Sequence, residues 1–229
     1  MKAILFDAGN TLLHLDYPWL ASLARSLGSK ALADDVGFAT AQVSRRGWPA
    51  PRVDDRPTAF FAGYFGAIGE AVGLSARAAE RFALAVETEH LGDRRGIWRS
   101  PAPQALEVLR GLNARGVLLG VVSNADGRVE EQLAAAGLRE PLRTVVDSYA
   151  VGVDKPDPRI FRIALGLLQV DAADACYVGD LFDVDVKGAR AAGLEALLYD
   201  RWNAYPELRE GRIRSLGELL NLPHADGAA

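Results

Sequence analysis

The sequence predicts an α/β protein, with a doubly wound parallel sheet of the Rossmann-like type and an inserted α-helical cap. In the C-terminal half, apolar strand-like runs alternate with helical patterns, which implies a parallel sheet with helices on both faces. Residues 16–92 instead hold four helical patterns with no strand between them. We therefore predict that residues 1–15 and 93–229 form the core and that residues 16–92 form the cap.

The first predicted strand covers residues 3–6 and ends at Asp7, where the small polar turn "AGNT" begins. Pro101 and Pro103 mark the return of the chain to the core after the cap. A Pro-rich loop at 48–57 interrupts the cap, because Pro is a strong breaker of regular structure. The four predicted cap helices cover residues 18–28, 30–47, 57–73 and 75–92.

The core then alternates between helices and strands. Apolar residues recur at helical spacing in 103–116, and Gly116 ends that helix. The run "GVLLGVV" at 116–122 is continuously apolar, as expected of a strand buried on both faces. Helix and strand then alternate, starting with a helix, at residues 129–137, 143–146, 157–168, 175–180, 185–193 and 195–200.

Composition limits the function classes. The chain has 229 residues, 49% hydrophobic and 24% charged, as in ordinary globular proteins. Its formal net charge of -4 shows no basic excess, so we expect no nucleic-acid partner. The single cysteine, Cys176, excludes an internal disulfide and fits a reducing compartment. No apolar stretch suits a signal peptide or a membrane span, so we expect a cytoplasmic protein with no membrane contact. The oligomeric state is not predicted.

Polar residues follow four of the predicted strands. Because the carboxyl ends of parallel strands share one edge of a sheet, we expect these residues to converge there. Several carboxylates at one edge repel one another unless cations neutralise them, and Mg²⁺ prefers such oxygen ligands. A lysine and a hydroxyl–amide pair beside them suit anionic phosphoryl oxygens. The residues are Asp7; Ser123 and Asn124; Lys155; and Asp180, Asp183 and Asp185.

In this order and context, the motifs resemble those of the haloacid dehalogenase superfamily of hydrolases, in the subclass with a helical cap. "DAGNTL" resembles its first motif, with Asp7 as the nucleophile, and "VVSN" its second. "KPDPRIF", with Lys155, resembles the third motif, and "GDLFDVDVKGARAAG" resembles the acidic fourth through Asp180 and Asp185. The resemblance covers essentially the whole chain, and four motifs in order are far more specific than any one alone.

The resemblance implies a Mg²⁺-dependent hydrolase that acts on small phosphorylated molecules through an aspartyl-phosphate on Asp7, with Lys155 as a second catalytic residue. The metal would be held by Asp7, the backbone carbonyl of Gly9, Asp180 and Asp185. The substrate would be bound by Asn10, Thr11, Ser123, Asn124 and Lys155. Asp183 has no role that the sequence fixes, beyond capping the helix that follows.

One residue departs from the family pattern. Phosphatases of this family carry a second Asp where this chain has Gly9, and that acid protonates the leaving oxygen. General acid–base assistance is worth roughly 10²–10⁴ in rate, so the enzyme should be slow on poor leaving groups. His14 and Asp16 lie close by in sequence and are candidates to replace the missing acid, although we expect both to be solvated loop residues.

Three hypotheses remain. The first and favoured one is the Mg²⁺-dependent phosphohydrolase. The second is a 2-haloacid dehalogenase or a phosphonatase-like hydrolase of the same fold; a phosphonatase needs a cap lysine, and the only one here, Lys30, reads as a surface residue. The third is a non-catalytic member that binds a phosphoryl ligand or another protein. Intact Asp7, Lys155 and acidic residues favour the first over the third.

Overall fold

The computed structural model describes residues 1–47 and 57–222. They form two compact units: Met1–His14 together with the described residues from Ser100 onward, and the described residues of Leu15–Arg99. The sequence placed the boundaries at 15/16 and 92/93, whereas the units divide at 14/15 and 99/100. That the second unit serves as a cap stays a prediction.

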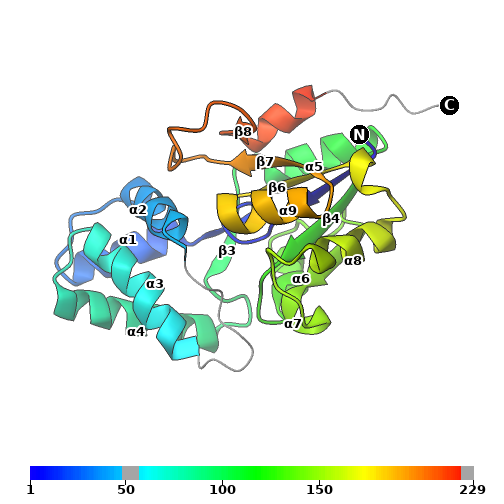
Figure 1. Cartoon of the computed structure of the whole chain (residues 1–229). Coiled ribbons are helices and arrows are strands. Elements are labelled where there is room, and N and C mark those ends of the chain that lie inside the picture. Colours follow the sequence, from blue (N-terminus) through cyan, green and yellow to red (C-terminus); the bar gives the residue numbers. More distant parts are fainter. Residues whose placement is uncertain (48–56, 223–229) are drawn as a thin grey trace. The chain divides into compact units, whose positions relative to one another are not determined.

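The first unit is built on a six-stranded sheet whose paired strands are all parallel (Figure 1). Strand order is β5-β4-β1-β6-β7-β8, so β1 is central and its apolar residues are fully buried. This confirms the predicted doubly wound, Rossmann-like core. The strands are β1 (Ala3–Phe6), β4 (Leu118–Ser123), β5 (Thr144–Asp147), β6 (Ala175–Gly179), β7 (Glu195–Tyr199) and β8 (Arg212–Ile213).

Helices cover both faces of this sheet, with α5 on one side and α8 and α9 on the other (Figure 1). The helix α8 has its buried residues at helical spacing, which explains how it packs on β4 and β5. The α-helices are α5 (Ala105–Ala114), α6 (Val129–Ala135), α7 (Ser148–Val151), α8 (Pro158–Leu168) and α9 (Lys187–Ala191). Two short segments are 3₁₀-helices, η1 (Ala172–Asp174) and η3 (Leu216–Asn221), and η2 (Phe182–Val186) is a π-helical turn.

The second unit contains four helices around its own apolar core. Asp16 caps α1 by accepting from the Trp19 amide, and Ser75 caps α4 in the same way through the Ala78 amide. Two short strands, β2 and β3, pair with each other in a separate sheet. The chain passes from the first unit to the second within β2 and returns within β3. The elements are β2 (Leu13–Leu15), α1 (Tyr17–Ser26), α2 (Ala33–Arg45), α3 (Pro57–Ala71), α4 (Ala76–Gly92) and β3 (Trp98–Pro101).

Three strands, β2, β3 and β8, were not predicted, because each has only two to four residues and none of them is a continuous apolar run. The predicted Pro-rich loop at 48–57 lies outside the described residues except for Pro57, which begins α3.

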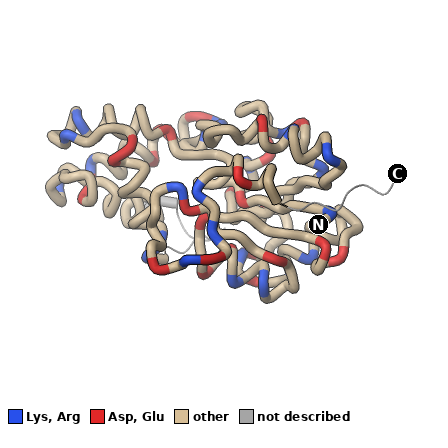
Figure 2. The backbone as a smooth tube through the Cα atoms, turned by 90° about the horizontal axis from the view of Figure 1, so that it is seen from above, with Lys and Arg blue, Asp and Glu red and all other residues tan. Residues whose placement is uncertain are grey.

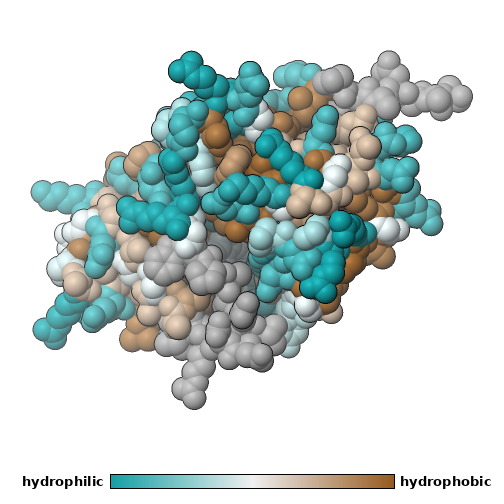
Figure 3. Space-filling view, in the orientation of Figure 1, coloured by the Kyte–Doolittle hydropathy of each residue, from teal (hydrophilic) through white to brown (hydrophobic). Residues whose placement is uncertain are grey.

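Charged residues of both signs are spread along the described parts of both units (Figure 2). Hydrophilic side chains cover much of the visible face, with apolar side chains between them (Figure 3). Within the described residues, none of the helices has the length and apolar character needed to cross a membrane.

Candidate active site

The carboxyl ends of the central strands bring the predicted residues to one edge of the sheet. Phe6 pairs in register with Val121 of β4 and Val178 of β6, so Asp7 follows β1 beside the ends of both neighbours. The Asp7 amide donates to the Val178 carbonyl at 2.8 Å, which keeps Asp7 in line with β6. In a doubly wound sheet this edge is where ligands bind.

Lys155 is the centre of the site. Its Nζ donates to Asp7 Oδ1 and to Asp185 Oδ1, both at 2.7 Å, and to the Tyr177 hydroxyl at 2.9 Å. All four side chains are buried, so these charge-assisted bonds form away from water. Burial alone would lower the pKa of Lys155, but the two carboxylates hold that pKa above its ordinary value. Lys155 is therefore a fixed cation at neutral pH.

Three carboxylates surround this one lysine. Oxygens of Asp7, Asp180 and Asp185 lie within 4.8 Å of one another. Burial raises the pKa of Asp7 to about 6, with Lys155 opposing the rise and Asp185 adding to it. Burial and the charges of Asp185 and Asp7 likewise raise the pKa of Asp180 well above its ordinary value. When all three carboxylates are ionised, they exceed the single ammonium by two negative charges, which one divalent cation neutralises. This all-oxygen donor set fits Mg²⁺.

Within the cluster, the Asp185 carboxylate is already engaged on both sides. Its Oδ1 accepts from Lys155 and, at 3.2 Å, from the Tyr177 hydroxyl, while its Oδ2 accepts from the Leu181 amide at 2.9 Å. Asp185 is fully buried, whereas Asp180 is half-buried. The two acids of the fourth motif thus differ: Asp185 anchors Lys155 and the acidic turn, and Asp180 lies nearer the surface.

Asn124 of the second motif holds the backbone of Lys155 in the third motif. The Asn124 side-chain nitrogen donates to the Lys155 carbonyl at 3.0 Å, and its oxygen accepts from the Lys155 amide at 2.7 Å. Both polar ends of Asn124 are thus used to hold the Lys155 backbone. Ser123 is the last residue of β4, where it is buried. Because the Asn124 side chain is already used by Lys155, Ser123 is the better candidate of the two to bind substrate.

The turn after Asp7 has the backbone shape that its sequence suggests. Asn10 adopts a left-handed conformation with φ of 58°, which Asn tolerates better than most residues. Its amide donates to the Leu13 carbonyl at 2.7 Å, which closes the turn. Thr11 is fully buried, and its hydroxyl has no hydrogen-bond partner among the described residues. Gly9 does not have a positive φ, so a side chain there would meet no backbone restriction.

The expectation of a solvated loop residue is wrong for His14, whereas Asp16 lies between β2 and α1 and is partly exposed. His14 lies within β2 between Leu13 and Leu15, is buried, and its ring stacks on that of Tyr199 at 6.2 Å. Burial, aided by the charge of Arg201, lowers the pKa of His14 to about 4, so His14 is not in its acidic imidazolium form at neutral pH.

Asp16 is occupied by structural contacts. Its Oδ1 caps α1, and its Oδ2 accepts from Arg99 Nε at 3.1 Å and pairs with Nη2 of the same guanidinium at 3.0 Å. Neither His14 nor Asp16 is therefore placed to act as the general acid that Gly9 cannot supply.

Two further residues match the structural interpretations of the sequence, whereas the expectation that Asp183 caps the following helix is wrong, because the residue before α9 is Val186. Asp183 is exposed, outside the carboxylate cluster, and pairs with Lys187 at 2.6 Å. Lys30 is exposed, as expected of a surface lysine. Cys176 is buried in β6, and burial raises the pKa of its thiol to about 12, so it is no nucleophile.

Two residues of the site were not singled out from the sequence. Tyr177 is buried in β6, and its hydroxyl joins Lys155, Asp185 and the Val122 carbonyl. A polar hydroxyl within the apolar run "ACYVG" was the available signal. Gly179 lies so close to Asp185 that a Cβ there would stand 2.6 Å from the Asp185 Cβ and Oδ2 atoms.

Replacing Gly179 by Ala is therefore expected to displace Asp185 and to lower the free energy of unfolding by about 1–3 kcal/mol, the usual cost of overpacking. Urea unfolding measures this. The matched control is Gly166→Ala in α8, where a Cβ meets nothing within 4 Å and Ala should stabilise the helix by about 0.5–1 kcal/mol. Equal effects of the two changes would contradict the close fit at Gly179.

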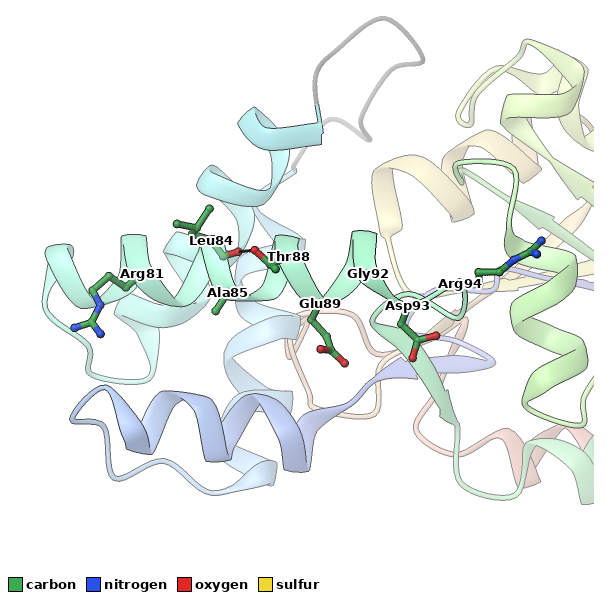
Figure 4. Close-up of a pocket in the computed structure, with 8 residues that line it drawn as sticks. All are labelled: Arg81, Leu84, Ala85, Thr88, Glu89, Gly92, Asp93 and Arg94. Carbon is green, nitrogen blue, oxygen red and sulfur yellow. Dashed lines mark hydrogen bonds between the residues drawn. The ribbon is translucent and has the colours of Figure 1, made fainter.

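A concave region on α4 in the second unit offers no comparable chemistry (Figure 4). Its two carboxylates, Glu89 and Asp93, point to the same side of the helix and accept from Arg99 Nη1 at 2.7 and 3.4 Å. Both carboxylates are therefore already paired with a cation. The region is lined by Arg81, Leu84, Ala85, Thr88, Glu89, Gly92, Asp93 and Arg94.

Comparison with known proteins shows which family this chain is similar to. Residues 1–193 match the family of haloacid dehalogenase-like hydrolases. A phosphoglycolate phosphatase of Rhodospirillum rubrum is 30% identical over 237 residues, which cover 99% of this chain and 93% of that protein. The crystal structure of a phosphatase from Thermococcus onnurineus has the same fold, with a TM-score of 0.60, 22% identity, and coverage of 96% of this chain and 97% of that one.

Other relatives match over a shorter length. The haloacid dehalogenase-like hydrolase domain-containing protein 3 of Bos taurus is 50% identical over 90 residues, which cover 39% of this chain. This match spans only 36% of the bovine protein.

Proposed function

Since this chain belongs to the haloacid dehalogenase-like hydrolases, we propose that it is a Mg²⁺-dependent phosphohydrolase that cleaves esters of small phosphorylated molecules. The observation that carries the proposal is the buried contact of Lys155 with Asp7 and Asp185, both at 2.7 Å, beside a third carboxylate. Relatives named phosphoglycolate phosphatase and phosphoserine phosphatase support the reaction class.

Asp7 is the proposed nucleophile. One of its oxygens accepts from Lys155, which leaves the other to attack phosphorus. A bond forms between that oxygen and phosphorus, the ester P–O bond breaks, and the alcohol leaves with a proton from the surroundings. Water then hydrolyses the aspartyl-phosphate to phosphate and regenerates Asp7. Because the pKa of Asp7 is about 6, the carboxylate is mostly ionised above that pH.

The proposed metal ligands are Asp7, Asp180 and the Gly9 carbonyl, with Asp185 acting through Lys155. Asp185 already accepts from three donors, whereas Asp180 is half-buried, and burial together with the charges of Asp185 and Asp7 raises its pKa, so that a nearby cation would favour its charged form. When bound, Mg²⁺ would neutralise these carboxylates and draw charge from the phosphoryl oxygens. Lys155 supplies the permanent positive charge on the other side of Asp7.

The remaining predicted residues divide into two roles. We assign Ser123 and the turn residues Asn10 and Thr11 to the phosphoryl group, because the Thr11 hydroxyl lacks a partner among the described residues and Ser123 ends the neighbouring strand. Asn124 is instead a positioning residue, since its amide holds the Lys155 backbone. Gly9 leaves the leaving group without an acid, so turnover of alkyl phosphates should be slow.

The test is hydrolysis of p-nitrophenyl phosphate with Mg²⁺ and with EDTA, using Asp7→Asn as the control. This leaving group hardly needs protonation, so Gly9 does not hide the first step. We expect turnover that requires Mg²⁺ and that falls at least about 10³-fold in Asp7→Asn, as for loss of a nucleophile. Mg²⁺ binding, followed by calorimetry, should weaken in Asp180→Asn. Absence of turnover in the wild-type chain would exclude the phosphohydrolase and return attention to dehalogenation or ligand binding.

A further inference from the structure

The loop after β7 is fixed in shape although it lies at the surface. Asp200 is buried, and its Oδ1 accepts from the Ala204 amide at 2.6 Å. Its Oδ2 accepts from the Tyr205 amide at 3.1 Å and from Arg212 Nη1 at 2.8 Å. Arg212 Nη1 also donates to the Tyr205 carbonyl at 2.7 Å. A loop tied by so many bonds to one carboxylate presents its exposed side chains in a set place.

Arg201 is the exposed cation that this loop presents next to the acidic edge. Gly179 pairs in register with Leu198, so Asp180 and Tyr199 follow side by side. The Arg201 guanidinium lies 5.2 Å from the centre of the Trp202 ring, and its positive charge acts on the Tyr199 hydroxyl. Burial raises the pKa of Tyr199, Arg201 opposes that rise, and the charge of Asp180 adds to it. Tyr199 thus lies within the fields of both Arg201 and Asp180.

Arg201 differs from the other cations around this edge. Lys155, Lys187 and Arg212 each pair with a carboxylate. Arg201 is exposed and forms no ion pair with any carboxylate of the described residues. An exposed guanidinium that lies over the Trp202 ring and has no carboxylate partner among those residues is suited to bind a carboxylate through two parallel hydrogen bonds.

The spacing matches a short bifunctional substrate. Strand β7 is two places from β1 in the sheet, which is roughly 10 Å at the usual strand separation. A phosphoryl group at Asp7, a short carbon chain and the long arginine side chain together cover such a distance. We propose that Arg201 binds the carboxylate of a phosphorylated short-chain acid whose phosphoryl group lies at Asp7. This inference rests on the proposed function and names its substrate class.

Calorimetry with two phosphonates of equal length tests the subsite without turnover. The probes are 3-phosphonopropionate, which carries the carboxylate, and propylphosphonate, which lacks it, both with Mg²⁺ present. We expect the wild-type protein to bind the carboxylated probe about 10- to 100-fold more tightly, the range of a charged hydrogen-bonded pair. Arg201→Gln should remove this preference, and Arg201→Lys should restore part of it.

Arg209→Gln is the charge-matched control, since Arg209 is also exposed and follows on the same stretch of chain. It should keep the preference, which separates a local contact from the net charge of the protein. A wild-type preference that survives Arg201→Gln, or no preference in the wild type, overturns the inference. Absence of p-nitrophenyl phosphate turnover in the wild type would instead overturn the proposed function. Failure of the Arg201 subsite and failure of the proposed function are therefore distinguishable.

Discussion

Replacing Gly9 by Asp is expected to raise the rate of alkyl phosphate hydrolysis by about 10²–10⁴, the usual worth of general acid–base assistance. Gly9 lies two residues after Asp7 in the turn that closes through Asn10 and Leu13, so a side chain there starts beside the nucleophile. Its φ is not positive, so the backbone accepts a non-glycine residue. Neither His14, with a pKa of about 4, nor Asp16, bound to Arg99, supplies this acid in the present chain.

The comparison of two substrates isolates this effect. Steady-state rates on glycerol 1-phosphate, a poor leaving group, should rise by the full amount, whereas rates on p-nitrophenyl phosphate should change by less than about tenfold. Gly9→Asn is the matched control, because it adds a side chain of the same size without an acidic proton. If Gly9→Asn accelerates both substrates as much as Gly9→Asp, the gain comes from packing, and the interpretation of Gly9 as a missing acid is wrong.

The core of this fold was predictable because its strands and helices are locally encoded. The strand before Asp7 and the run "GVLLGVV" are apolar on both faces, and the helix α8 has a clear apolar stripe. The strands β2, β3 and β8 were missed for the opposite reason. Each is too short for a period of two residues to show, and His14 even places a polar residue in a buried strand.

The site was predictable in its members but not in its connections. The rule that strand ends share one edge was sufficient to group Asp7, Lys155 and Asp185, which are in contact. It was not sufficient to show that Asn124 holds the Lys155 backbone or that Tyr177 completes the lysine's partners, because those contacts join residues 31 and 22 positions apart. Such contacts depend on how the strands stack and on side-chain direction, which a motif does not record.

Replacing Lys155 by Met is expected to lower the free energy of unfolding by about 3–5 kcal/mol at neutral pH in EDTA, and to abolish turnover. Removing one partner of a buried ion pair leaves the other charges uncompensated, and here those are the carboxylates of Asp7 and Asp185. Lys187→Met is the control. Lys187 pairs with Asp183 in the same motif, but both side chains are more than half exposed, so its loss should cost less than about 1 kcal/mol.

The loss in Lys155→Met should also depend on pH, in a direction that the pKa of Asp7 fixes. That pKa is already raised to about 6, and without the Lys155 charge it rises further. A carboxyl group with a higher pKa in the folded than in the unfolded state does not destabilise the fold below the unfolded-state pKa, near 4. As pH rises from that value to the folded-state pKa, the free energy of unfolding falls, because the folded state resists ionisation. Urea unfolding of Lys155→Met and wild type should therefore differ little at pH 4.5 and most at pH 8. If the difference in free energy of unfolding instead shrinks as pH rises, Lys155 does not stabilise the charged form of Asp7, and the interpretation of their contact as an ion pair is wrong.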